Sequence, residues 1–202
     1  MEIRQNAERN TANSPKRIAR VQKSRYAEGK GVTIMREYKA RIVDRILQDK
    51  LEAKGAVVIE GPKWCGKTTT AMQVAGSILR IDEPSKRESN IQMSQIAPER
   101  LLQGETPRLI DEWQIAPKLW DAARYEVDSR GEVGQFIFTG SAVPIESEEI
   151  THSGTGRFTW LTMRPMSLYE SGESSGEVSL GDLFGKPERI VGSNSTDCNL
   201  RF

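Results

Sequence analysis

The stretch from residue 56 to residue 70 constrains the fold of this chain more than any other part of the sequence. A short apolar run, Ala-Val-Val-Ile, leads toward Gly61, and four residues separate Gly61 from Gly66, which is followed by Lys67 and Thr68. This spacing matches the pattern G-x-x-x-x-G-K-[ST], in which a strand delivers a glycine-bounded loop to the start of a helix. The stretch therefore predicts a phosphate-binding loop (P-loop) in an α/β fold, with an open, mostly parallel sheet flanked by helices.

The residues of this loop suit the binding of a nucleotide polyphosphate. Backbone N–H groups of the loop and of the first helical turn point at an anion, and the helix dipole adds to the attraction. We expect Lys67 to reach the β and γ phosphates and the Thr68 hydroxyl to bind Mg²⁺. The Cys65 thiol, beside Lys67, is expected to react readily unless a nucleotide covers it. The expected nucleotide-binding residues are Gly61, Pro62, Lys63, Trp64, Cys65, Gly66, Lys67, Thr68 and Thr69.

A second candidate site follows the apolar strand predicted at residues 108–113. A carboxylate at a strand end beside a phosphate loop can hold the water shell of Mg²⁺, so Asp111 is expected to complete the metal site. Neighbouring residues on an extended chain point in opposite directions, so we expect Glu112 to act as the base for the attacking water. Another predicted strand ends at Thr139 and Ser141, whose hydroxyls either sense the γ phosphate or close an ordinary turn.

Composition points to a single soluble domain. The chain has 202 residues and a net charge of +1, so its overall charge gives no reason to expect nucleic acid or an anionic membrane as partner. The two cysteines show neither metal-ligand nor disulfide spacing. No apolar run approaches the about 20 residues that span a bilayer, so we expect a cytoplasmic protein without a membrane partner.

Hydrophobic periodicity predicts the remaining elements. The expected helices cover residues 36–53, Lys67 to about Leu79, 97–102 and 117–129. One further strand is expected to end near Asp82, and two more are expected at residues 135–139 and 157–161.

The two ends of the chain lack such periodicity. Residues 1–34 are rich in Arg and Lys and predict a disordered basic arm, which we interpret as a solvated tail. The alternative is an electrostatic contact with nucleic acid, which this arm alone could make. Residues 35–185 are the expected ATPase-like core, and residues 186–202 an unstructured tail. Met35 opens the patterned part and is an alternative start to Met1.

Five segments of the sequence resemble a prokaryotic family of AAA-type ATPases, in which the ATPase domain is usually followed by a domain of unknown function. These segments are residues 61–69, 109–113, 138–141, 153–157 and 164–170. The resemblance covers about residues 36–185. It implies ATP and Mg²⁺ as ligands, with Lys67 and Thr68 as phosphate and metal contacts. It also implies metal and base roles for Asp111 and Glu112, a sensor role for Thr139 or Ser141, and a homo-oligomer in which Arg157 stabilises charge across a boundary.

Members of that family continue into a helical lid and a second domain, whereas this chain ends soon after Leu183 and Phe184. The resemblance therefore implies an ATPase core with an incomplete lid and impaired turnover. Two alternatives stay open, a small-molecule kinase on the same loop and an interaction switch or truncated remnant that binds nucleotide without turnover. The adjacent Asp-Glu pair favours ATP hydrolysis by water.

Overall fold

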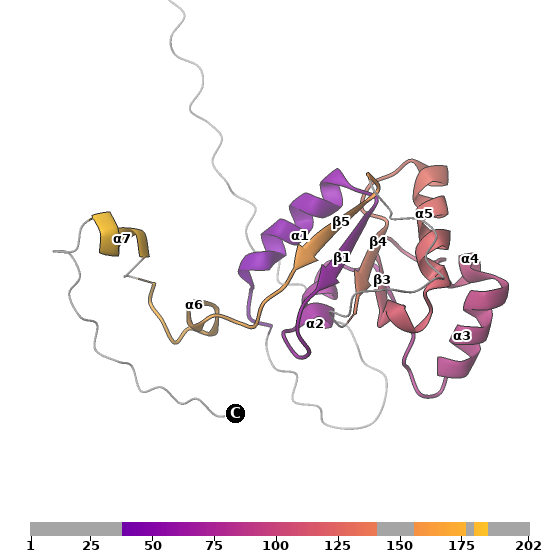
Figure 1. Ribbon diagram of the computed structural model, residues 1–202, viewed down its shortest axis with the longest axis horizontal. Coiled ribbons are helices and arrows are strands. Elements are labelled where there is room, and N and C mark those ends of the chain that lie inside the picture. The colour runs from indigo at the N-terminus through magenta and orange to yellow at the C-terminus, as the bar shows by residue number, and fades with distance from the viewer. Residues whose placement is uncertain (1–37, 141–155, 177–179, 186–202) are drawn as a thin grey trace, which may run out of the picture. The chain divides into compact units, whose positions relative to one another are not determined.

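The computed structural model describes residues 38–140, 156–176 and 180–185, and shows a central sheet with helices on both of its faces (Figure 1). The predicted N-terminal arm and C-terminal tail lie outside the described residues. No helix in the described ranges is long and apolar enough to cross a membrane. In chain order the elements are α1 (Ile42–Ala53), β1 (Ala56–Glu60), α2 (Lys67–Ala71), β2 (Ser77–Arg80), α3 (Arg87–Ile96), α4 (Pro98–Leu101), β3 (Arg108–Asp111), the short 3₁₀ helix η1 (Trp113–Ile115), α5 (Lys118–Arg130), β4 (Phe136–Thr139), β5 (Phe158–Thr162), α6 (Leu168–Ser171) and α7 (Leu180–Gly185).

The strands form one parallel sheet in the order β2-β3-β4-β1-β5. β4 therefore lies between β1 and β3, and its last residue, Thr139, is in register with Ile59 on one side and Asp111 on the other. Because all strands run the same way, the carboxyl ends of β1, β3 and β4 meet at one edge of the sheet. The fold is that of an α/β P-loop NTPase, which confirms the predicted fold class.

Helices bury both faces of this sheet. On one face α1 and α2 pack Leu47 and Ala71 against the β1 residues Val57 and Ile59. On the other face α4 and α5 cover the alternate residues of the same strands, among them Val58. Buried parallel strands with helices on each face are expected for this pattern of short apolar runs.

An aromatic cluster fills the core beneath α5. Trp120 stacks on Trp113, with ring centroids 4.9 Å apart, and meets the edge of Phe158 at 4.5 Å. Trp120 is 2% exposed and packs in the core. The apolar stripe of α5 is buried over its whole length, at Leu119, Trp120, Ala123 and Val127.

Helix α1 begins later than predicted. Residues 38–41 are not helical, and the helix starts at Ile42, whereas periodicity predicted a start at residue 36. The Asp44 carboxylate accepts the backbone N–H of Arg41 at 2.8 Å. Such a contact from the third helical residue caps the helix at this point.

Helix α2 is shorter than predicted. It ends at Ala71, and Ser77–Arg80 form β2, although the helix was predicted to continue to about Leu79. The threonines at positions 68–70 are β-branched and favour a helix weakly. Gly76 then donates its N–H to the loop before β3 at 2.8 Å, which leads the chain into the sheet.

Helix α3 was missed, since no helix was predicted between Asp82 and residue 97. Its buried residues are Asn90 and Ser94 rather than apolar side chains, so no hydrophobic period marks it. The Asn90 amide donates to the Arg80 carbonyl at 3.1 Å, which satisfies the buried polar group and ties α3 to β2.

Trp120→Ala should lower the free energy of unfolding by about 3–5 kcal/mol, because it empties the centre of the aromatic cluster. Trp64→Ala is the matched control, since Trp64 is 99% exposed, and should change stability by no more than about 0.5 kcal/mol. Urea unfolding followed by circular dichroism measures both. Equal losses in the two variants would contradict this description of the core.

Candidate functional site

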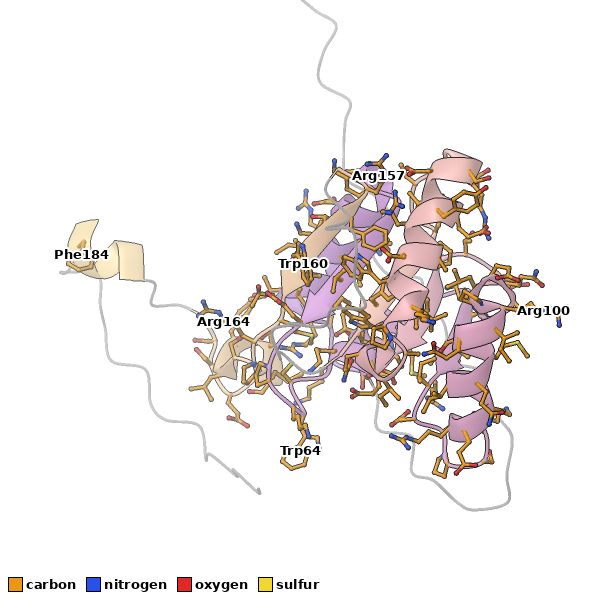
Figure 2. All side chains as sticks on the ribbon, turned by 45° about the vertical axis from the view of Figure 1, so that its right-hand side comes forward. Trp64, Arg100, Arg157, Trp160, Arg164 and Phe184 are labelled. Carbon is orange, nitrogen blue, oxygen red and sulfur yellow. The ribbon has the colours of Figure 1, made fainter. Side chains whose placement is uncertain are left out.

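The phosphate loop runs from Gly61 at the end of β1 to Gly66 at the start of α2. Both glycines have positive φ, 148° and 98°, and any side chain at Gly61 would overlap the Met163 carbonyl oxygen. Trp64 is also left-handed, at φ 63°, which is uncommon for an aromatic residue, and its side chain projects from the loop (Figure 2). The exposed residues of the predicted nucleotide site are Pro62, Lys63, Trp64 and Thr69.

Lys67 lies inside the curve of this loop. Its Nζ donates to the carbonyl oxygens of Gly61 at 2.8 Å and Pro62 at 2.9 Å, and the residue is 8% exposed. An ammonium group carries three donors and a full positive charge. The loop therefore holds a cation at the point where a phosphate-binding loop meets its anion.

Asp111 joins the loop to the sheet. Its Oδ1 accepts the Thr68 hydroxyl at 2.8 Å and the Thr139 hydroxyl at 2.6 Å, and the residue is 8% exposed. These side chains come from β3, α2 and β4. No cluster of three or more His, Cys, Asp or Glu is found in the described parts of the chain, so a cation here would rely on one carboxylate, a hydroxyl and the ligand's own oxygens.

Glu112 lies beside this junction, but the extended-strand argument that was used to predict the direction of its side chain is wrong. The prediction treated residues 111 and 112 as consecutive residues of an extended strand, whereas β3 ends at Asp111 and Glu112 is left-handed, at φ 55°. The turn into η1 sets its direction instead. Its carboxylate accepts a hydrogen bond from the Gln114 side-chain amide. A non-glycine residue held in this backbone region is often part of a functional site.

Cys65 faces the core and not a ligand. Its side chain is 5% exposed and belongs to the apolar cluster beneath α1 and α2. The expectation that this thiol reacts readily is therefore wrong, because the loop turns the Cys65 side chain into the apolar core. A buried thiol behaves as a small apolar residue.

Arg41 braces the loop from the other side. Its guanidinium donates to the Cys65 carbonyl at 2.9 Å, to the Arg164 carbonyl at 2.9 Å and to the Glu170 carboxylate at 3.0 Å. The Arg41 and Glu170 side chains are only 5% and 8% exposed. This ion pair, which sequence reasoning missed, connects residues 129 positions apart, and no local pattern could have revealed it.

Several interactions change the pKa of Glu170. Burial raises it, but hydrogen bonds from the backbone N–H groups of Ser167 and Ile42, from the Ser167 hydroxyl and from Arg41 outweigh burial and lower the pKa to about 2. The carboxylate is therefore charged in the folded protein over the whole neutral range, and it fixes the start of α6 through the Ser167 cap.

One predicted site residue in the described ranges, Arg157, is not brought to this edge. Arg157 precedes β5, at the amino edge of the sheet, where it pairs with Asp128 at 2.6 Å. Figure 2 shows Arg157 and Trp64 at opposite ends of the sheet. Within one chain Arg157 therefore does not meet the phosphate loop. Ser141 lies outside the described residues.

Comparison with known proteins agrees with this geometry. Residues 53–172, more than half of the chain, match the family model described as an AAA domain. The chain is also similar to the molybdenum import ATP-binding protein ModC of Granulibacter bethesdensis, with 32% identity over 143 residues. That alignment covers 68% of this chain and 36% of ModC, so the chain spans little more than a third of this relative.

Alkylation of Cys65 should be slow with or without Mg-ATP, because the apolar core and not the nucleotide covers the thiol. The measurement is the rate of iodoacetamide labelling in a Cys198→Ser background, which leaves Cys65 as the one thiol. Labelling in urea supplies the rate for the exposed group. If the folded protein were labelled fast and ATP slowed the labelling, the predicted reactive thiol at the nucleotide site would be supported instead.

Glu170→Gln should lower the free energy of unfolding near neutral pH, and the difference from the parent should shrink as the pH falls. The folded pKa of about 2 lies below the usual 4.5, so the charged carboxylate stabilises the fold above the unfolded pKa, and this stability is lost on acidification toward pH 2. Urea unfolding between about pH 7 and pH 2.5 measures the trend. The exposed Glu173→Gln is the control, and a pH-independent difference for Glu170→Gln would contradict the pairing.

Proposed function

Because the chain belongs to the family of AAA domains, we propose that it binds ATP together with Mg²⁺ and hydrolyses ATP with water as the nucleophile. The observation that carries this proposal is the junction at Asp111, whose carboxylate accepts hydroxyls from Thr68 in the first turn after the loop and from Thr139 at the end of β4. Carboxylates are common Mg²⁺ ligands, and this one is hydrogen-bonded to Thr68 directly after the loop, which supports the proposal of a metal site there. The import activity in the name of ModC is not assigned to this chain.

The loop supplies the binding energy for the phosphates. Lys67, which already lies inside the loop, would exchange its hydrogen bonds to the Gly61 and Pro62 carbonyls for hydrogen bonds to phosphate oxygens. The exchange replaces contacts with neutral carbonyls by contacts with anionic oxygens. Charge-assisted hydrogen bonds of this kind are the stronger ones, so ATP binding is favoured.

Thr68 and Asp111 fit a Mg²⁺ site. Both offer oxygen atoms, the two are 2.8 Å apart, and Mg²⁺ is commonly held by one or two carboxylates together with the phosphates of its nucleotide. Thr68 and Asp111 would hold the metal, whose positive charge would offset the negative charge that develops in phosphoryl transfer. Thr139 keeps Asp111 oriented toward Thr68 through its own hydrogen bond.

Glu112 is the proposed base. It directly follows Asp111 and is partly exposed at the same edge of the sheet, so its carboxylate can take a proton from a water that lies in line with the γ phosphate. Thr139 is the proposed sensor among the described residues, since its hydroxyl already contacts Asp111. Ser141 stays an alternative sensor outside them.

An open pocket beside the loop suits the nucleoside end of ATP. It is lined by residues 39–42 and 169–172. Arg41 belongs to this wall and donates to the Cys65 carbonyl, so the pocket adjoins the phosphate loop. The exposed ring of Tyr169 can cover a base there.

Arg157 fits the proposal only in an assembly. It lies at the amino edge of its own sheet, so it would act on the nucleotide of a neighbouring copy, as arginines do in trans in related phosphoryl-transfer reactions. Binding without turnover is the main alternative, and phosphate release from ATP alone separates it from hydrolysis. Release that requires a second acceptor would instead favour a kinase.

Lys67→Ala should weaken ATP binding about tenfold to a hundredfold, because it removes charge-assisted hydrogen bonds to the phosphates. Glu112→Gln should keep ATP binding but slow hydrolysis about 10²–10⁴-fold, because it removes only the base. Calorimetry or the fluorescence of the exposed Trp64 measures binding, and steady-state phosphate release measures turnover.

The matched controls are Lys86→Ala, an exposed lysine before α3, and Glu132→Gln, an exposed glutamate before β4. Both should bind and hydrolyse ATP like the parent. Hydrolysis at the parent rate by Glu112→Gln would remove Glu112 as the base, and no phosphate release from the parent protein would refute hydrolysis itself.

A further inference from the structure

Gln114 contacts the proposed base directly. It lies in η1, two residues after Glu112, and its Nε2 donates to the Glu112 Oε2. The amide can bond in one direction only, because its oxygen would repel the carboxylate if the group were reversed. Within the described ranges, this is the one hydrogen bond found at the Glu112 carboxylate.

The other end of the same amide packs on the turn that follows β4. Gln114 Oε1 is buried without a hydrogen-bond partner in the described ranges, and a Cβ placed on Gly140 would overlap it. Gly140 directly follows Thr139, which bonds Asp111. A buried unpaired carbonyl is unfavourable, so its retention here calls for an explanation.

Gln114 therefore spans the space between the base and the strand that carries the sensor. On one side it touches Glu112, and on the other it is pressed against Gly140, next to the Asp111 junction. Trp113, which is 3% exposed and stacked on Trp120, anchors the turn from which Gln114 projects. The hydrogen bond to Glu112 on one side and the close approach of Gly140 on the other restrict the rotation of the amide.

We propose that Gln114 is a positioning residue for ATP hydrolysis, which holds one oxygen of the Glu112 carboxylate so that the other faces the attacking water. The proposal rests on the proposed function of Glu112 as base. Gly140 is a glycine at this position because any side chain would push the Gln114 amide away from Glu112.

Positioning residues act on the chemical step and not on ground-state binding. The loss of one hydrogen bond to a charged group is expected to lower kcat about tenfold to a hundredfold, with KM for ATP unchanged. The effect should also depend on the presence of the Glu112 carboxylate, because Gln114 has no role in hydrolysis apart from it.

The test uses Gln114→Met, which keeps the length of the side chain and removes the donor, and Gly140→Ala, which displaces the amide. Both should lower kcat about tenfold to a hundredfold without changing KM or the affinity for a non-hydrolysable ATP analogue. Gln92→Met, at an exposed position of α3, is the matched control and should behave like the parent.

The double variant Glu112→Gln/Gln114→Met separates positioning from a merely structural role. It should hydrolyse ATP no more slowly than Glu112→Gln alone in single-turnover measurements, because the carboxylate that Gln114 positions is already gone. A further loss in the double variant would contradict the proposal, and so would parent-like or faster turnover by Gln114→Met.

Failure of this inference is distinguishable from failure of the proposed function. If the parent protein releases no phosphate, both are overturned. If the parent and Gln92→Met hydrolyse ATP, Glu112→Gln does not, and Gln114→Met is unaffected, Glu112 remains the base and the positioning role of Gln114 is refuted.

Discussion

The Asp111 carboxylate is the interaction on which the arrangement of this site depends. One oxygen of a nearly buried side chain accepts two hydroxyls, from Thr68 and Thr139, and so ties the first turn of α2 to the ends of β3 and β4. A buried carboxylate without such donors would be strongly unfavourable. The hydrogen bonds that offset the desolvation of the Asp111 carboxylate therefore also hold the phosphate loop in place against the sheet.

The loop is braced on its other side by a second buried charge. Arg41 donates a hydrogen bond to the Cys65 carbonyl, and Glu170 forms an ion pair with Arg41. These contacts connect the segment before α1 and the segment after β5 to the loop. Underneath, the Cys65 side chain anchors the loop in the apolar core. A loop restrained from three directions loses little conformational entropy when an anion binds, and this preorganisation favours ligand affinity.

Sequence reasoning succeeded where a local motif sets the conformation of one segment. It failed where contacts with neighbouring elements set the conformation. The strand, loop and helix start around Gly61 and Lys67 were predicted because their spacing reflects the shape of one short segment. The direction of Glu112 was argued from an extended backbone that ends one residue earlier. Helix α3 was missed because it buries Asn90 and Ser94, whose burial depends on a hydrogen bond to β2.

The sequence by itself determined the phosphate loop, the parallel α/β class and the identity of Asp111 and Glu112 as the carboxylates at a strand end. Only the tertiary structure decided that β4 lies between β1 and β3, which brings Thr139 to Asp111. It also decided the ion pair that joins Arg41 to Glu170. Periodicity and spacing describe the conformation of a single segment, whereas strand order and buried ion pairs arise when segments far apart in the chain bury their surfaces against one another.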